Sequence, residues 1–266
     1  DEKRLEVLRG LAHLPILGIC SDCPEILKPW LTGGDGLPRV VCHRGANFVA
    51  PENTLIAASI CISQGFDIVE IDVRTTADGE IVLMHDATVD RTTNGKGLVR
   101  DLTLEQIQQL DAGSSYSEIY KGTGVPTLDE FLEHCRGRCG AYVEIKDADP
   151  DQVLEKVVAH EMLDSVFFWC RNRDVMKRMR SLEPQAQLMA TRWMFPDLES
   201  TIADYQANIV EYELGRDDFS EIPKCRLLGV KAMAFSLTHD LGKLRQIWAV
   251  NADLVNLDRP DLFKLL

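Results

Sequence analysis

Apolar and polar positions follow two different patterns along this chain. Short apolar runs predict buried strands, and apolar positions spaced three and four residues apart predict amphipathic helices. The strands predicted in this way are Arg39–His43, Asp67–Val73, Ile81–His85, Ala141–Lys146, Ser165–Cys170, Gln187–Thr191, Ile209–Leu214, Lys231–Leu237 and Leu254–Leu257. The predicted helices are Thr54–Gln64, Leu104–Leu110, Leu128–Cys135, Asp151–His160, Arg173–Leu182, Asp197–Tyr205, Asp217–Cys225 and Leu241–Val250.

The order of these elements indicates the fold class. Strands that alternate with helices imply a parallel sheet with right-handed crossovers. Eight such units, with Ile81–His85 as an extension of the second strand region, predict an α/β fold of the (β/α)8 TIM-barrel type. A doubly wound open sheet is the alternative, but no Gly-x-Gly-x-x-Gly motif follows a strand to support a dinucleotide-binding version of it.

Two segments do not fit the strand–helix repeat. Residues 1–37 are expected to form an N-terminal extension that caps or plugs the barrel, with a helix around Lys3–Leu14. Residues 87–126 are too long for an ordinary strand-to-helix loop, and such an insertion often carries function in a barrel. No low-complexity tract or clear linker divides the chain, so we expect residues 1–266 to form a single domain.

Composition narrows the range of partners. The 266-residue chain carries a net charge of -13, which argues against non-specific binding to nucleic acid or to anionic membranes. No apolar run approaches the ~20 residues that a membrane span requires. Positive charge near an anionic small-molecule substrate must then come from a bound cation and from a few residues such as Arg44 and Lys146. Nothing in the sequence indicates the oligomeric state.

The sequence leaves the cellular compartment open. Because the first residue is Asp, a removed signal peptide and a periplasmic or secreted location are one alternative, and a cytoplasmic location is the other. Cys20 and Cys23 form a lone Cys-x-x-Cys without the second ligand pair of a usual zinc site. A local disulfide between Cys20 and Cys23, or between Cys135 and Cys139, is a further alternative, whereas Cys42 is expected to be a buried free thiol.

Acidic residues alternate with apolar ones on two predicted strands. Glu70 and Asp72 share one face, because successive strand residues point to opposite sides. Two carboxylates on one face repel unless a cation lies between them, so this pair favours a divalent metal site over a solvated acidic strand end. By the same rule Glu144 and Lys146 share a face, where Glu144 could add a third oxygen ligand and Lys146 could bind a phosphate oxygen. A salt-bridged barrel interior is the alternative for this second pair.

Two histidines each end a predicted strand and are each followed by a charged residue. His43 and His85 are suited to proton exchange near neutral pH, and two such residues are harder to explain structurally than one. Arg44, next to His43, can hold a phosphate group through two hydrogen bonds. Glu211 shares a strand face with Glu213, and it either faces the barrel interior as a further site residue or is exposed to solvent.

Taken in order, these motifs resemble the glycerophosphodiester phosphodiesterase family. The resemblance covers roughly residues 39–261, nearly the whole chain after the N-terminal extension. It is carried by His43-Arg44-Gly45, Pro51-Glu52-Asn53-Thr54, Glu70-Ile71-Asp72-Val73, Thr75 with Asp78-Gly79, His85-Asp86, Asp90-Arg91-Thr92-Thr93-Asn94-Gly95, Leu110-Asp111-Ala112-Gly113-Ser114, Pro126-Thr127-Leu128, Glu144-Ile145-Lys146 and Asp258-Arg259-Pro260-Asp261.

The resemblance implies a TIM barrel with a small inserted subdomain and the hydrolysis of glycerophosphodiesters to glycerol 3-phosphate and an alcohol. It further implies a cyclic phosphate intermediate, formed and opened by acid–base catalysis. Carried over motif by motif, the implied roles are Mg²⁺ or Ca²⁺ binding by Glu70, Asp72 and Glu144, acid–base catalysis by His43 and His85, phosphate contacts by Arg44 and Lys146, and a polar or metal contact by Glu52.

One stretch departs from the family pattern. The family often has Trp-Thr-Val-Asn on the seventh strand, where this chain has Phe235-Ser236-Leu237-Thr238. Glycerol or the alcohol is expected to pack there, so Phe235 is a candidate for substrate contact. A phospholipase-like enzyme acting on a lipid headgroup is one alternative function, and it would need an apolar rim such as Trp193-Met194-Phe195. A non-catalytic phosphodiester-binding barrel is the other, but the intact histidines and carboxylates argue against it.

Overall fold

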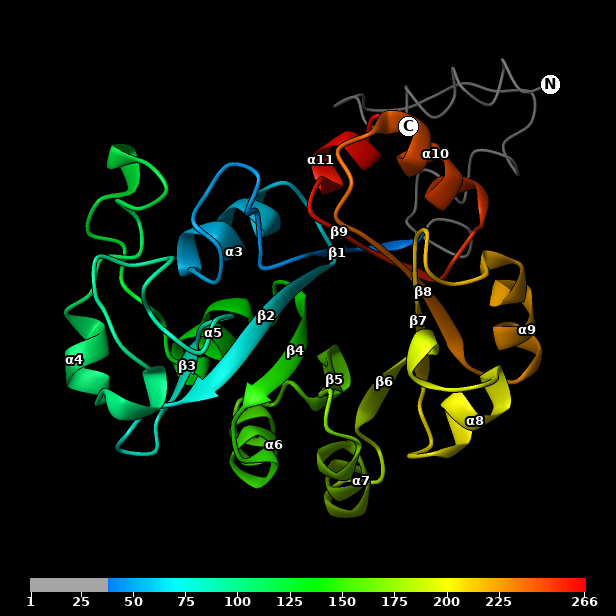
Figure 1. Cartoon of the computed structure of the whole chain (residues 1–266), viewed down its shortest axis with the longest axis horizontal. Helices are drawn as coiled ribbons and strands as arrows, with labels where there is room; N and C mark the ends of the chain where they lie inside the picture. The colour runs from blue at the N-terminus through cyan, green and yellow to red at the C-terminus, as the bar shows by residue number, and fades with distance from the viewer. Residues whose placement is uncertain (1–37) are drawn as a thin grey trace.

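A computed structural model describes residues 38–266 and contains a closed ring of parallel strands (Figure 1). The ring closes because β1 pairs in parallel with both β2 and β9. The predicted α/β TIM barrel is therefore confirmed, and the open-sheet alternative is wrong. The ring strands are β1 (Arg39–Cys42), β2 (Ile68–Thr75), β4 (Gly140–Asp147), β5 (Val166–Trp169), β6 (Gln187–Thr191), β7 (Ile209–Glu213), β8 (Lys231–Ser236) and β9 (Leu254–Leu257).

Helices that connect successive strands surround the ring (Figure 1). Several begin at the side-chain caps that their sequences provide. Thr127 and Glu130, for example, form a capping box in which each side chain accepts a hydrogen bond from the other residue's backbone N–H. The helices are α3 (Leu55–Ser63), α5 (Leu128–Cys135), α6 (Pro150–Ala159), α7 (Arg173–Leu182), α8 (Leu198–Ala203), α9 (Ile222–Leu227), α10 (Leu241–Ala249) and α11 (Pro260–Phe263).

The segment expected to extend the second strand region lies outside the ring. It forms β3 (Ile81–Leu83), which pairs antiparallel with β2. The chain then makes a long excursion that contains 3₁₀ turns at Val99–Asp101 and Glu118–Tyr120 and the short helix α4 (Leu104–Gln108). These residues pack around an apolar cluster of their own, separate from the barrel core, which consists of Val82, Met84, Val89, Val99, Ile107, Ala112 and Val125.

The barrel interior changes character between its two ends. At the amino-terminal end each ring strand contributes one buried apolar or aromatic side chain: Val41, Ile68, Tyr142, Phe167, Met189, Ile209, Met233 and Leu254. Two residues further along each strand direction, the inward positions are His43, Glu70, Glu144, Trp169, Thr191, Glu211, Phe235 and Asn256. Because the strands are parallel, all of these mostly polar positions lie at the carboxyl-terminal end of the barrel, where barrel sites are usually built.

Several other expectations concern segments away from the ring. Cys42 is a buried free thiol as predicted, and Cys135 and Cys139 are also free, so the local disulfide proposed for them is absent. Among the described residues no helix is both long enough and apolar enough to cross a membrane. The helix around Lys3–Leu14, the pair Cys20 and Cys23, and the cap formed by residues 1–37 fall outside the described residues. The single domain over residues 1–266 therefore stays a prediction.

Candidate active site

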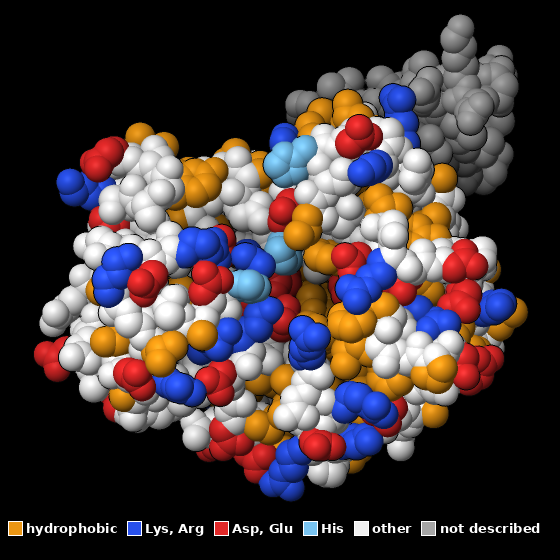
Figure 2. All heavy atoms as spheres, viewed as in Figure 1, with side chains coloured by type: hydrophobic (Ala, Val, Ile, Leu, Met, Phe, Trp, Pro, Cys, Tyr) orange, Lys and Arg blue, Asp and Glu red, His pale blue; other side chains and the backbone are white. Residues whose placement is uncertain are grey.

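A cavity of about 680 Å³ opens at the carboxyl-terminal end of the barrel. In Figure 2 this face is hollowed near its centre, with acidic and histidine side chains inside the hollow and basic side chains around it. The cavity is lined by all eight of the second-layer inward positions and by Arg44, His85 and Lys146. The strand ends thus bring together residues that are up to 213 positions apart, from His43 to Asn256.

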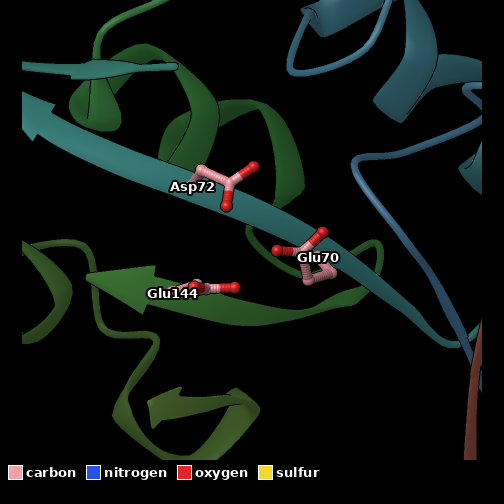
Figure 3. A group of neighbouring side chains, drawn as sticks. All are labelled: Glu70, Asp72 and Glu144. Atoms are coloured by element: carbon pink, nitrogen blue, oxygen red, sulfur yellow. The ribbon is translucent and has the colours of Figure 1, made fainter. Parts of the chain in front are cut away.

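Three carboxylates from neighbouring strands converge in this cavity (Figure 3). Glu70 and Asp72 extend from one side of β2, and Glu144 extends toward them from β4, where it is the register partner of Asp72. One oxygen of each carboxylate lies within 4.8 Å of the others. The alternation inferred for both strands therefore brings the predicted carboxylates together, and Glu70 and Asp72 are each only 1 % exposed.

Only part of the hydrogen-bonding capacity of these carboxylates is used. Glu70 Oε2 accepts a hydrogen bond from the backbone N–H of Arg44 at 2.5 Å, whereas the buried Glu70 Oε1 has no partner among the residues that the structure describes. Asp72 Oδ2 accepts from Asn53 Nδ2 at 2.8 Å, and Asn53 Oδ1 accepts in return from the Asp72 backbone N–H at 3.0 Å. Asp72 Oδ1 is buried without a well-directed hydrogen bond, although Lys146 Nζ lies 3.2 Å away.

The electrostatics of the cluster indicate an unbalanced negative charge. Burial and the neighbouring Asp72 and Glu144 raise the pKa of Glu70, and burial and Asp72 raise the pKa of Glu144. Burial also acts to raise the pKa of Asp72, but Lys146 and Arg44 outweigh it, and the pKa is lowered. Two buried carboxylate oxygens that lack hydrogen bonds, in a cluster that resists full ionisation, fit a hard divalent cation with oxygen ligands.

Two cationic side chains border the carboxylates. Lys146 Nζ donates a short hydrogen bond to Glu144 Oε1 and also faces Asp72. Arg44 Nη1 donates to Glu52 Oε1 at 3.1 Å. The buried Arg44 Nε lies 3.6 Å from Asp72 Oδ2 and makes no hydrogen bond within residues 38–266. Burial would lower the pKa of both cations, but the surrounding carboxylates outweigh it, so both groups stay charged. Both line the cavity and are available to an anionic ligand.

The turn after β1 places Arg44 for this contact. Arg44 and Asn53 both adopt left-handed backbone conformations, with φ of 54° and 55°. Asn adopts the left-handed conformation more readily than Arg does, because its short polar side chain can form hydrogen bonds with the nearby backbone. Arg lacks this compensation for the steric cost of the conformation. The Arg44 conformation directs its N–H to Glu70, and the Asn53 N–H donates to the Arg44 carbonyl at 3.1 Å. Strained backbone of this kind is concentrated at functional sites in proteins.

The two histidines have the same type of partner. His43 Nδ1 lies 2.6 Å from Asp258 Oδ1, which also accepts from Asn47 Nδ2 at 2.6 Å. His85 Nδ1 lies 2.7 Å from Asp86 Oδ1. An ionised carboxylate can only accept hydrogen bonds, so each ring carries a proton on Nδ1 and leaves Nε2 as the atom that exchanges protons. Both rings line the cavity, just beyond the ends of β1 and β3.

Arg91, in the long excursion after β3, links the segment that follows His43 to the segment that follows His85. Arg91 donates to both oxygens of Glu52, at 2.8 and 2.7 Å, and to both oxygens of Asp86, at 2.7 and 3.1 Å. Glu52 in turn accepts from Arg44, so it supports a residue of the cavity although it is absent from the cavity lining. Arg91 was not assigned a role from the sequence, because its spacing from Glu52 gives no indication that they meet.

The two remaining candidates lie in the cavity wall. Phe235 places its ring edge-on to His43, with the ring centroids 5.7 Å apart. Glu211 faces the barrel interior, as one of its two alternatives proposed, and burial together with Glu144 raises its pKa to about 8. Sequence reasoning missed Trp169, Thr191 and Asn256, which the same alternation rule would have found at the corresponding positions of β5, β6 and β9.

Comparison with known proteins shows consistent similarities. The model of the glycerophosphoryl diester phosphodiesterase family matches residues 43–207. YhdW of Bacillus subtilis (strain 168) is 41% identical over 133 residues, which are 50% of this chain and 54% of YhdW. The matched stretch thus spans about half the length of this curated relative.

Two solved structures resemble the whole barrel. A crystal structure of a glycerophosphodiester phosphodiesterase from Agrobacterium tumefaciens str. C58 has a TM-score of 0.80 and 36% identity, covering 86% of this chain and 100% of that chain. A phosphodiesterase from Oleispira antarctica, solved in complex with the product sn-glycerol-3-phosphate, has a TM-score of 0.75 and 27% identity, covering 86% of this chain and 96% of that chain.

Proposed function

The chain belongs to the glycerophosphoryl diester phosphodiesterase family, and from this premise we propose that it hydrolyses glycerophosphodiesters to glycerol 3-phosphate and an alcohol in a metal-dependent reaction. The observation that carries the proposal is the cavity in which a carboxylate cluster with unpartnered oxygens meets two carboxylate-bound histidines and two cations. The Oleispira antarctica relative, solved with sn-glycerol-3-phosphate, supports the choice of product.

Glu70, Asp72 and Glu144 are proposed to hold the metal, Mg²⁺ or Ca²⁺. When bound there, the cation would polarise a phosphoryl oxygen and offset the negative charge that grows in the transition state. Asn53 keeps Asp72 in place through two hydrogen bonds, and a single hydrogen bond from the Arg44 backbone N–H holds Glu70. Both carboxylates are thereby oriented before any ligand arrives, which reduces the reorganisation needed for binding.

Arg44 and Lys146 are proposed to bind the phosphate oxygens of the substrate. Both cations line the cavity, and both are anchored by carboxylates, so the phosphate group would meet preset positive charge. The guanidinium can offer two parallel hydrogen bonds, whereas the ammonium acts as a compact charge. The net charge of -13 on the chain repels an anionic substrate, and this local positive charge offsets that repulsion at the site.

His43 and His85 are proposed to move the protons. Nε2 of one histidine removes the proton of the glycerol 2-hydroxyl, whose oxygen then attacks phosphorus. The bond from phosphorus to the alcohol oxygen breaks, and Nε2 of the other histidine protonates that oxygen. Water then opens the cyclic phosphate with the two roles reversed, which yields glycerol 3-phosphate. Asp258 and Asp86 stabilise the imidazolium formed on each partner ring.

The two alternative functions receive less support. A lipid-acting enzyme would need the apolar rim at Trp193-Met194-Phe195, but Phe195 is buried against the barrel core and is only 8 % exposed. A barrel that only binds phosphodiesters would not need both histidines to be held by carboxylates, with no bond to Nε2 from any of residues 38–266. The hydrolytic function accounts for the carboxylate support of both histidines.

One assay tests the proposal directly. The protein is incubated with glycerophosphocholine, glycerophosphoethanolamine and glycerophosphoglycerol, each with Mg²⁺, with Ca²⁺ and with a chelator, and glycerol 3-phosphate is measured. We expect release with at least one metal and its loss in chelator. Absence of release under every condition would overturn the proposed activity, and release that persists in chelator would overturn the metal dependence.

A further inference from the structure

We propose that the alcohol half of the substrate lies against Trp169, Arg171 and Trp193, and that this wall selects anionic or hydroxylated alcohol groups over quaternary ammonium groups. The proposal rests on the proposed function, because it names the substrate class of the same cavity. All three residues line that cavity, at the ends of β5 and β6. We refer to them below as the β5–β6 wall.

Trp169 presents a hydrogen-bond donor that has no partner within the described part of the chain. Its indole Nε1 is buried and makes no hydrogen bond, and an indole N–H can only donate. Trp169 is the register partner of Glu144, so this donor lies on the strand next to the carboxylate cluster. A buried donor without a partner loses stability unless a ligand oxygen satisfies it. Trp169 Nε1 therefore favours a ligand that places an oxygen acceptor against this part of the β5–β6 wall.

Arg171 adds a positive charge that no carboxylate neutralises. Among residues 38–266 its side chain makes no hydrogen bond or ion pair, and its contact is with the Trp193 ring, 5.8 Å from guanidinium carbon to ring centroid. Asn172 follows it and caps α7 through its side-chain oxygen, which accepts from the Asp174 backbone N–H at 3.0 Å. The amide nitrogen of Asn172 is thereby left as a further donor at the cavity edge.

Trp193 would be the obvious site for a quaternary ammonium group, because such groups bind over aromatic faces. Here two guanidinium groups already lie over this ring. The Arg216 guanidinium carbon is 3.8 Å from the ring centroid, and that of Arg171 is 5.8 Å away. A trimethylammonium group would have to displace a guanidinium and approach a like charge, and both effects oppose its binding.

Negative groups near the wall do not reverse its charge. Glu213 lines the cavity, but its carboxylate is paired with Arg216 at 3.2 Å. Asp217 accepts a hydrogen bond from the Glu213 backbone at 2.7 Å and does not line the cavity. Arg192 is neutralised by Glu221 at 2.6 Å. Glu211 is buried on the interior side and interacts with Asn256. Arg171 is thus the uncompensated charge of the wall.

The test uses three synthetic glycerophosphodiesters. In each, the alcohol is ethanol substituted at its second carbon, and the substituent is a carboxylate, a hydroxyl or a trimethylammonium group. We expect kcat/KM to decrease in that order for the unaltered protein. Arg171→Gln should lower the ratio of carboxylate to trimethylammonium substrate by about 3-fold, the scale of one exposed charge pair. Arg171→Lys should largely keep the ratio. Arg178→Gln, which removes an arginine from α7 that pairs with Asp151 away from the cavity, is the control for overall charge.

The double variant Arg171→Gln/Arg216→Gln should show the largest relative gain for the trimethylammonium substrate, because it uncovers the Trp193 ring and leaves Glu213 unpaired. If Arg171→Gln and the double variant left the ratio of kcat/KM for the carboxylate and trimethylammonium substrates unchanged, the proposed role of the β5–β6 wall would be refuted. A preference of the unaltered protein for the trimethylammonium substrate would refute it as well. If none of the three diesters is hydrolysed, the proposed function fails instead. Equilibrium titration of the same diesters then tests the wall, and equal affinities for the carboxylate and trimethylammonium forms would refute it.

Discussion

Each histidine in the cavity is held by an aspartate, one adjacent in sequence and the other distant. Asp86 follows His85 directly, whereas Asp258 reaches His43 across 215 residues. In both cases the aspartate sets the ring tautomer and leaves Nε2 as the atom that exchanges protons. The two rings are therefore chemically equivalent in their support and differ in what surrounds them. Burial lowers the pKa of His85, although Asp72 and Asp86 act in the opposite direction.

We expect His43→Ala and His85→Ala each to lower kcat by ~10²-fold or more, because each removes one partner of the acid–base pair. Steady-state assays of glycerol 3-phosphate release measure the effect, and thermal unfolding shows whether the fold is kept. His134→Ala is the matched control, since His134 lies on α5 and bonds to Ser59 outside the cavity. A near-normal rate in either cavity variant would refute that histidine's role.

A buried glutamate gives a prediction about pH. The pKa of Glu211 is about 8 in the folded protein against an ordinary value of 4.5. Between these pH values the unfolded chain has lost this proton and the folded protein keeps it, so the free energy of unfolding falls as pH rises through the window. Glu211→Gln should remove this contribution, which is on the order of 1–3 kcal/mol after allowance for relaxation of the site.

Urea unfolding of the metal-free protein at pH 5 and pH 8 measures this difference, with Glu155→Gln as a surface control. Glu155 is exposed on α6, so its replacement should leave the pH dependence as it is in the unaltered protein. Glu70 and Glu144, whose pKa values are also raised, contribute with the same sign in every variant. If the free energy of unfolding fell equally between pH 5 and pH 8 in Glu211→Gln and in the unaltered protein, the raised pKa of Glu211 would be contradicted.

At the scale of elements, alternation along each ring strand decides which side chains enter the cavity. One inward position per strand is apolar at the closed end, and the next is polar or aromatic at the open end. The excursion after β3 is a separate element with its own apolar cluster. It contributes Arg91, which binds Glu52 and Asp86 and so connects the excursion to the segments that contain these two residues. A change that disrupts the excursion should therefore disturb the active site as well as lower the stability of the protein.

Gly113 in this excursion has no room for a side chain. A Cβ atom there would lie 1.8 Å from the carbonyl oxygen of Tyr120, so Gly113→Ala requires the backbone to move. We expect a loss of about 2 kcal/mol in the free energy of unfolding, as for other forced overpacking. Hydrogen exchange of the backbone amides around residues 111–123 should also become faster.

Gly124→Ala is the matched control, because a Cβ atom at Gly124 would meet nothing within 4 Å. Both variants add one methyl group to the same excursion, and only the first one creates a clash. If Gly113→Ala were as stable as Gly124→Ala and exchanged its amides at the same rate, the close packing of this loop against Tyr120 would be disproved.

At the scale of the whole molecule, barrel closure concentrates negative charge at one end of a chain that is already acidic. The three carboxylates come from two adjacent strands, and Lys146 and Arg44 offset only part of their charge. A cation that binds only the folded protein must therefore stabilise it.

Addition of Mg²⁺ or Ca²⁺ should raise the midpoint of thermal unfolding. At a free metal concentration of about 100 times Kd, the expected gain is about 2.7 kcal/mol. Glu70→Gln should greatly reduce this gain, because it removes one of the three carboxylates, and Glu155→Gln should retain it. A metal-induced shift of the same size in both variants would place the cation elsewhere on the protein.

The sequence by itself determined the order of strands and helices and the side of each strand to which a residue points. Those features follow from local periodicity, which does not depend on distant parts of the chain. The barrel, the convergence of Glu70, Asp72 and Glu144, and the presence of His43 and His85 at strand ends could all be inferred in this way.

Only the tertiary structure decided which residues meet across the closed ring. The contacts of Asp258 with His43, of Arg91 with Glu52 and of Arg216 with Trp193 join segments whose separation follows no period. The antiparallel pairing of β3 outside the ring and the burial of Phe195 depend on how whole elements pack. Periodicity specifies a face and a direction, whereas a contact also needs the distance that closure of the barrel sets.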